Sequence, residues 1–257
     1  MIVVDRRADG VAWITIDRPA ARNAMTFAMW AQLRDAARAL DAEPGVRAVV
    51  LTGGGSEAFI AGTDIAEFRN VRSGDDGIAY ERRIDQVITA LEDVRVPTIA
   101  AIAGACTGGG VSVAAACDLR IGAPNARVGV PIARTLGNCI SLKSMARAGA
   151  IVGVDAVKRL ILSAQLLDAR EAYRIGFFGE LVERVDELVP RAAEAAAAIG
   201  RLAPRTLRAT KEMARRIRRA VPLPEDDDLV RMCYGSDDFR EGLSAFLDKR
   251  PARWSGS

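Results

Sequence analysis

The chain has 257 residues and contains no histidine. This absence excludes the most common general base, the Ser–His and Cys–His pairs of nucleophilic catalysis, and most zinc sites. The four cysteines, Cys106, Cys117, Cys139 and Cys233, form no short-spaced motif. We therefore expect reduced thiols, no metal site and a cytoplasmic location.

Aromatic side chains and long apolar runs are also scarce. Aromatic residues make up 5% of the chain, so the core must consist largely of Ala, Val, Ile and Leu, which suits closely packed helices better than an all-β sandwich. No apolar run reaches the roughly 18 residues that a membrane span requires. The first ten residues, MIVVDRRADG, contain several charged side chains directly after a short apolar stretch, so they do not form the longer apolar region of a secretory signal peptide. We expect no association with a membrane.

The net charge is modest, at +3, because 36 Lys and Arg nearly balance 33 Asp and Glu. Much of the positive excess lies in residues 201–219, which hold eight Arg or Lys and the single acid Glu212. A solvated helix face explains such a run, and so does a surface that meets the phosphates of a nucleotide-like cofactor. No recognition motif accompanies the charge, so we expect no nucleic-acid partner.

The order of elements predicts an α/β core followed by helices. Apolar runs predict strands over residues 11–16, 47–52, 98–103 and 118–122. Between them we expect helices over 27–42, capped by Thr26, over 77–93 and over 111–116. This alternation predicts parallel strands with right-handed crossovers. Further helices are expected over 154–163, 168–176, 186–199, the basic run before Ala220, and 237–250, with a linker over 222–228.

Two segments join an apolar run to small residues and the start of a helix. They are Ala58-Phe-Ile-Ala-Gly-Thr-Asp-Ile-Ala-Glu-Phe68 and Ala101-Ile-Ala-Gly-Ala-Cys-Thr-Gly-Gly-Gly-Val-Ser112. Glycines let a ligand approach the backbone, and the free N–H groups of a helix's first turn favour a negative oxygen. A carbonyl oxygen that becomes an enolate suits such a site. Taken alone, three glycines are more simply explained by a tight turn.

Together, the two segments resemble the signatures of the crotonase family, also called the enoyl-CoA hydratase/isomerase family. The first matches the family pattern A-F-C-A-G-A-D-I-x-E, and the second, with Cys117-Asp118, matches V-x-G-x-x-x-G-G-G before a helix ending in C-D. The resemblance spans nearly the whole chain. It also includes Asp17-Arg-Pro19, Arg22-Asn-Ala24, residues 168–176 and residues 236–250.

The resemblance implies a spiral of ββα units over residues 1–200, which holds an acyl-CoA site, and a helical region over 201–257 that forms homotrimers or hexamers. It implies a coenzyme A thioester as substrate and no bound cofactor. The thioester carbonyl would lie between two backbone N–H groups, those of Thr63 and Gly109. By the same resemblance, the adenine and pantetheine contacts are Arg22, Ala24, Ala61, Gly62, Asp64 and Ile65. For Asp64, an ordinary helix N-cap is an equal alternative.

The chain departs from the family at the two glutamates that hydratases use. One carboxylate must accept a proton from water while the other donates one. The first position, two residues after the glycine run, is Ser112, and the second, after a G-x-P pattern, is Ile132. The loss of both should abolish ordinary hydration. Ser112 could still donate a hydrogen bond to the acyl group, and Glu67 is expected to be a helix-surface carboxylate.

The segment after Pro131 is also unlike the family's Pro-Gly-x-Gly-Gly loop, since it reads Ala133-Arg-Thr-Leu-Gly-Asn-Cys-Ile-Ser141. Arg134 could orient a carboxylate on the substrate, or form an ordinary surface ion pair. Asn138 is a candidate substrate contact. Cys139 near a helix start could have a lowered pKa and act as a nucleophile, or could be an inert small apolar residue.

Three functions therefore remain open. The first is an acyl-CoA enzyme, a lyase, isomerase or hydrolase, whose oxyanion site serves a reaction other than standard hydration. The second is a catalytically silent acyl-CoA-binding protein, since fold alone does not settle chemistry. The third is a purely structural role, which would need the coenzyme A pocket to be closed.

Overall fold

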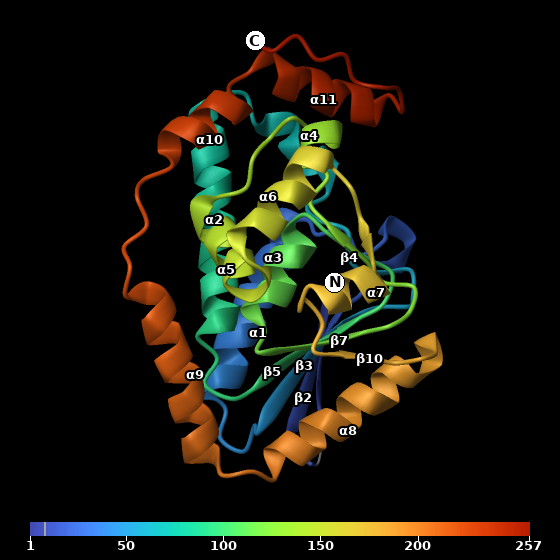
Figure 1. Ribbon diagram of the computed structural model, residues 1–257, viewed down its shortest axis with the longest axis vertical. Coiled ribbons are helices and arrows are strands. Elements are labelled where there is room, and N and C mark those ends of the chain that lie inside the picture. Colours follow the sequence, from blue (N-terminus) through green and yellow to red (C-terminus); the bar gives the residue numbers. More distant parts are fainter. Residues whose placement is uncertain (8) are drawn as a thin grey trace.

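The computed structural model describes residues 1–7 and 9–257, and in it two sheets run side by side through the core (Figure 1). The six-stranded sheet has the order β1-β2-β3-β5-β7-β10 and the four-stranded sheet the order β4-β6-β8-β9. The strands of the large sheet are β1 (Ile2–Arg6), β2 (Val11–Ile16), β3 (Ala48–Gly53), β5 (Thr98–Ile102), β7 (Leu119–Gly122) and β10 (Glu180–Leu181). Those of the small sheet are β4 (Ala58–Ile60), β6 (Ala105–Thr107), β8 (Arg127–Gly129) and β9 (Leu167–Asp168).

Along the chain, a strand of the large sheet is followed by a strand of the small sheet and then by a helix, and this order repeats. The units are β3-β4-α2, β5-β6-α3 and β7-β8 followed by α4. The helices of this part are α1 (Phe27–Ala42), α2 (Gly74–Glu92), α3 (Gly109–Ala116), α4 (Ile132–Thr135), α5 (Leu142–Val152), α6 (Val154–Ser163) and α7 (Ala169–Arg174). Short 3-10 turns are η1 (Pro19–Ala21), η2 (Ile65–Asn70) and η3 (Val185–Glu187). The result is the expected spiral of ββα units.

Parallel pairing holds β2, β3, β5 and β7 together, as the strand–helix–strand order predicted. β1 is the exception, because it pairs antiparallel with β2, the strand that follows it in the chain. One face of the large sheet packs against α8 (Leu188–Gly200), whose buried Leu188, Ala192 and Ala196 recur at helical spacing. The other face packs against α1, α2 and α3. Small alanine side chains let α8 lie close to the sheet.

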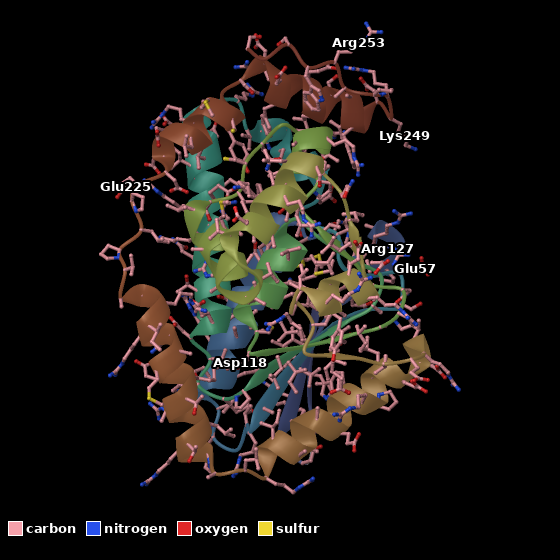
Figure 2. The ribbon with its side chains drawn as sticks, in the orientation of Figure 1. Glu57, Asp118, Arg127, Glu225, Lys249 and Arg253 are labelled. Carbon is pink, nitrogen blue, oxygen red and sulfur yellow. The ribbon has the colours of Figure 1, made fainter. Side chains whose placement is uncertain are left out.

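The last three helices wrap the outside of the molecule: α9 (Pro204–Arg219), α10 (Asp227–Tyr234) and α11 (Asp237–Leu247) (Figure 1). Two basic residues of α9 form ion pairs with acidic residues of the core. Lys211 pairs with Asp118 at 2.6 Å and Arg215 pairs with Asp93 at 2.6 Å, so part of its charge holds the helix to the core. Asp118 lies at the end of the sheet beside α9, while Lys249 and Arg253 extend into solvent near α11 (Figure 2). The predicted linker over 222–228 ends earlier than expected, because α10 begins at Asp227.

Candidate active site

The two glycine loops meet at one edge of the small sheet. β4 and β6 pair in parallel, so the segments that follow them leave the sheet at the same edge. The Thr107 hydroxyl donates to the Ala61 carbonyl at 3.0 Å and ties the loops together. A Cβ on Gly62 would lie 3.5 Å from the Thr107 carbonyl oxygen and 4.0 Å from the Gly109 nitrogen. The backbones at positions 62 and 109 are therefore close neighbours.

Each loop offers a backbone N–H that the described residues leave free. The Gly62 carbonyl accepts from Met25 N–H at 2.8 Å, and Asp64 N–H donates to the Met25 carbonyl at 2.8 Å. Since the residues on either side of Thr63 make this bridge, its own N–H points to the opposite side. Gly109 is the first residue of α3, where helical N–H groups lack an intrahelical partner. The positive end of the helix dipole adds to the attraction for an anionic oxygen.

Trp30 on α1 contacts both loops. Its indole N–H donates to the Thr63 hydroxyl at 3.0 Å, and the same hydroxyl lies 2.7 Å from the Tyr80 hydroxyl. A Cβ on Gly109 would lie 2.9 Å from Trp30 Cζ2, so the indole ring occupies the space beside the glycine. Trp30 is fully buried and therefore fixed. It therefore packs against both loops and holds the Thr63 side chain in place.

A cavity of about 500 Å³ opens in front of these groups. It brings together nearly all the site residues that the sequence predicted: Arg22, Ala24, Ala61, Gly62, Thr63, Asp64, Ile65, Gly109, Ser112, Ile132, Asn138 and Cys139. Arg134 is the exception, because its side chain is exposed on α4 and does not line the cavity. The turn that presents Arg22 and Ala24 is held by buried Asn23, whose amide donates to the Ala58 carbonyl at 2.6 Å.

The predicted positions of the two hydratase glutamates both face this cavity. Ser112 is 7% exposed on α3, and Ile132 is 9% exposed at the start of α4. Neither can accept a proton from water without help. Asp64 and Glu81 are the carboxylates among the described residues that line the cavity. The structure places Asp64 as the N-cap of η2, accepting from Ala66 N–H at 3.0 Å, and its other oxygen binds Arg18 at 2.6 Å.

Glu81 on α2 is the carboxylate that the motif analysis missed. It is 7% exposed, and it accepts hydrogen bonds from the Tyr234 hydroxyl at 2.6 Å and from Ser141 N–H at 3.1 Å. Burial raises the pKa of Glu81 to about 8; the Tyr234 hydrogen bond opposes this shift, and the nearby Asp85 charge adds to it. The signal in the sequence is the buried stripe of α2, in which Glu81 and Asp85 share a face with Ile78 and Ile88.

The loop that replaces the glycine-rich segment is tied to α10. The Asn138 amide donates to the Tyr234 hydroxyl at 3.0 Å, and its Oδ1 is buried without a hydrogen-bond partner among the described residues. The expectation of a lowered pKa at Cys139 is wrong. Cys139 precedes α5 by three residues, and its hydrogen bond with Cys233, together with burial, raises the pKa of the thiol. The helix dipole falls off within the first turn and does not overcome these effects.

Glu67 is half-buried, and its carboxylate accepts from Phe27 N–H at 3.1 Å at the start of α1. It does not line the cavity, in keeping with a structural role. Among residues 1–7 and 9–257, no three His, Cys, Asp or Glu side chains cluster in a way that could hold a metal ion. No helix in the same ranges is long and apolar enough to cross a membrane.

Comparison with known proteins identifies the family of the chain. The family described as Enoyl-CoA hydratase/isomerase matches residues 6–257. The chain belongs to this family. It is 32% identical to a crotonyl-CoA hydratase of Syntrophomonas wolfei over 98% of this chain and 97% of that protein. It is also 32% identical to a short-chain-enoyl-CoA hydratase of Clostridium acetobutylicum, over 96% of this chain and 95% of that one.

Solved structures show the same crotonase fold. A methylmalonyl-CoA decarboxylase in complex with 2-nitronate-propionyl-CoA superposes with a TM-score of 0.89 at 27% identity, covering 100% of this chain and 98% of that one. An enoyl-CoA hydratase/carnithine racemase from Magnetospirillum magneticum gives a TM-score of 0.80 at 29% identity, with 100% and 97% covered. Hydratases and a decarboxylase thus both resemble this member of the enoyl-CoA hydratase/isomerase family.

Proposed function

We propose that this family member binds an acyl-CoA thioester and holds its carbonyl between the N–H groups of Thr63 and Gly109. The observation that carries the proposal is the pair of free backbone donors at one cavity, with one of them at a helix N-terminus. Such donors stabilise the negative oxygen of an enolate, and each contributes about 3–4 kcal/mol to catalysis in comparable sites.

The coenzyme A part would lie along the cavity wall made by Ala24, Ala61, Gly62 and Ile65, with Arg22 at the exposed rim. An exposed guanidinium suits the phosphates of coenzyme A. The acyl chain would extend toward Ser112 and Ile132. Ser112 is proposed as a hydrogen-bond donor to the acyl group. The proposed assembly is a homotrimer or hexamer, and the thioester is substrate rather than cofactor.

The reaction that uses this site is proposed to be other than standard hydration. Hydration needs one group to take a proton from water and another to protonate carbon, and each group contributes about 10²–10⁴ in rate. Ser112 and Ile132 supply neither function. A reaction that forms an enolate without activating water avoids the requirement.

Loss of CO₂ from a carboxyacyl-CoA is a second candidate of this kind. The support is the close superposition on a structure that is titled as methylmalonyl-CoA decarboxylase. Carbon–carbon cleavage leaves its electron pair on the thioester oxygen as an enolate, which the same two N–H groups would stabilise. The uncharged Ser112 and Ile132 fit a reaction in which no water is activated.

Binding and turnover test these proposals separately. Acetyl-CoA at 100 times its Kd should raise the apparent stability by about 2.7 kcal/mol, seen as a higher Tm. Crotonyl-CoA should bind and keep its enoyl absorbance, because hydration is absent. An unchanged Tm would refute acyl-CoA binding. Hydration at the rate of a competent hydratase would refute our interpretation of Ser112 and Ile132. Release of CO₂ from methylmalonyl-CoA would favour the second candidate.

A further inference from the structure

Two cysteines meet where the cavity wall contacts α10. Cys139 lies in the loop between α4 and α5 and lines the cavity, whereas Cys233 lies on α10. The Cys139 thiol is hydrogen-bonded to the Cys233 sulfur. The Cys139 sulfur also lies 3.9 Å from the Leu229 carbonyl oxygen, which in an α-helix accepts the backbone N–H of Cys233 one turn later. The Cys233 backbone nitrogen is therefore within about 7 Å of the Cys139 sulfur.

Hydrogen bonds on either side of the thiol pair hold the loop against α10. The Asn138 amide donates to the Tyr234 hydroxyl at 3.0 Å, and each of these residues is the immediate neighbour of one of the two cysteines. At the start of α5, Leu142 N–H donates to the Asp226 carboxylate, which precedes α10, at 2.5 Å. The backbone that carries the two thiols is thus fixed at both sides, so the sulfurs stay together.

The two thiols differ in how easily they ionise. The hydrogen bond from Cys139 lowers the pKa of Cys233, and burial opposes this shift. The same hydrogen bond, burial and the charges of Glu81 and Asp226 raise the pKa of Cys139. Both side chains are half-buried, so a small oxidant can reach them. Because the thiolate is the nucleophile, Cys233 is the attacking sulfur and Cys139 the partner that resolves the product.

The other two cysteines lie in the core and serve as internal controls. Cys106 and Cys117 are buried, and burial raises the pKa of both thiols. The Cys117 thiol donates to the Val113 carbonyl at 3.4 Å. Buried thiols that stay protonated are inert toward oxidants. A mild oxidant should therefore distinguish the pair at the cavity wall from the pair in the core.

We infer that Cys139 and Cys233 are a dithiol modification site, which a hydroperoxide oxidises to an intramolecular disulfide that weakens binding in the cavity. The Cys233 thiolate attacks hydrogen peroxide, so a sulfur–oxygen bond forms, the oxygen–oxygen bond breaks, and hydroxide leaves and takes up the proton that Cys233 released. The Cys139 sulfur then attacks the Cys233 sulfur, the sulfur–oxygen bond breaks, and the second water carries away the Cys139 proton. Two thiols lose two electrons, and one peroxide becomes two waters. A dithiol reductant reverses the step by exchange.

The disulfide should displace the cavity wall rather than α10. A sulfur–sulfur bond is about 2.05 Å long, much shorter than a hydrogen bond between thiols, so one side must move. α10 packs closely on α2, since a Cβ on Gly77 would lie 2.3 Å from Tyr234 Cβ (Figure 1). Residues 137–140 form neither helix nor strand. This loop should shift toward α10 and lose contact with the acyl group, a consequence that rests on the proposed function.

Formation of the disulfide is tested first, on the full-length wild type without any ligand. Of the four free thiols, hydrogen peroxide should remove two, counted after unfolding. Peptide mapping without reductant should join Cys139 to Cys233 within one chain. Cys139→Ser and Cys233→Ser should each form no intramolecular disulfide. Retention of all four thiols, a disulfide between two chains, or sulfinic acid without a disulfide would overturn the inference.

The coupling to the cavity is tested with butyryl-CoA, a saturated acyl-CoA that has no double bond to react. The oxidised wild type should bind it at least about 5-fold more weakly than the reduced wild type, the lower end of typical couplings between sites. The same factor must act in reverse. Saturating butyryl-CoA should therefore raise the reduction potential of the disulfide by about 20 mV or more in a dithiol redox titration. This titration needs no variant.

Cys233→Ser is the matched control for the effect of peroxide on binding. Its substituted side chain lies on α10 and does not line the cavity. Peroxide should leave its affinity for butyryl-CoA unchanged, since oxidation of methionine alone should have no effect. An equal loss of affinity in Cys233→Ser and the wild type would overturn the inference.

The outcomes separate this inference from the proposed function. If butyryl-CoA binds neither the reduced nor the oxidised wild type, the proposed function fails, and the coupling of the disulfide to the cavity fails with it. If the disulfide forms and both redox forms bind butyryl-CoA equally, the proposed function stands and the inference is overturned.

Discussion

Gly109 allows one N–H group of the site to be removed with a matched control. Gly109→Pro removes the donor at the first position of α3, where proline is well tolerated. The preceding Gly108 has a ψ of −121°, far from the helical values that proline disfavours in its neighbour. Gly109→Ala keeps the N–H. Either variant places a Cβ 2.9 Å from Trp30 Cζ2 and 3.0 Å from Cη2, so both share this crowding at Cβ.

The difference between the two variants therefore combines the loss of one hydrogen bond with the bulk of the proline Cδ, which occupies the place of the amide hydrogen. In the ground state, a hydrogen bond to a neutral carbonyl contributes about 0.5–1.5 kcal/mol, so Gly109→Pro should bind butyryl-CoA at least about 2- to 13-fold more weakly than Gly109→Ala. In the transition state the oxygen carries charge, and the loss should be about 10²–10³-fold in kcat. Calorimetric titration gives the first value, and turnover of methylmalonyl-CoA gives the second.

The ratio of the two effects is the decisive result. A larger loss in turnover than in affinity is expected of a donor that meets developing charge. Equal affinity and equal turnover in Gly109→Pro and Gly109→Ala would mean that this N–H does not contact the carbonyl, and the reasoning would fail.

Further predictions concern the residues behind the site. Tyr80→Phe removes a hydrogen bond to the Thr63 hydroxyl and should lower turnover about 2- to 13-fold with little change in Tm; unchanged turnover would argue against positioning by Tyr80. Burial raises the pKa of Glu81 from 4.5 to about 8, so its contribution to stability is full below pH 4.5 and is lost as pH rises through 8, with a slope of at most about 1.4 kcal/mol per pH unit. Urea unfolding at several pH values should show this slope in the wild type and its loss in Glu81→Gln; parallel curves would contradict it. Arg147→Ala leaves Asp85 without its buried partner and should cost about 3–5 kcal/mol in urea unfolding at pH 7, whereas a loss below 1 kcal/mol would mean that the pair is hydrated.

The sequence predicted the large sheet well, because its strands are apolar runs bounded by Gly and Pro. β2, β3, β5 and β7 all lie where those runs placed them. The small sheet was missed, since β4, β6 and β8 have three residues each and show no periodicity of their own. The spiral that these strands complete was expected from resemblance alone. α10 was missed because its acidic first turn has the composition of a linker.

The site was predictable where chemistry depends on the backbone. Glycines at fixed spacing mark the loops around Thr63 and Gly109. Gly62 has a φ of +108°, which residues with a side chain rarely adopt, and a Cβ on Gly110 would lie 2.3 Å from the Ile60 carbonyl oxygen. No local sequence pattern predicted that Glu81 and Trp30 belong to the site, because tertiary packing brings each of them there from a helix. Asn138 was found in its own loop, but its partner Tyr234 lies 96 residues away. Contacts over that separation do not follow from local pattern.

The polarisation of the thioester carbonyl tests the central claim most directly. The measurement is the infrared stretching frequency of butyryl-CoA labelled with ¹³C at the thioester carbonyl, free and bound. Two N–H donors weaken the C=O bond, so the frequency should fall on binding to the wild type and to Gly109→Ala. It should recover part of the way in Gly109→Pro. A saturated complex whose carbonyl frequency equals that of free butyryl-CoA would contradict the account.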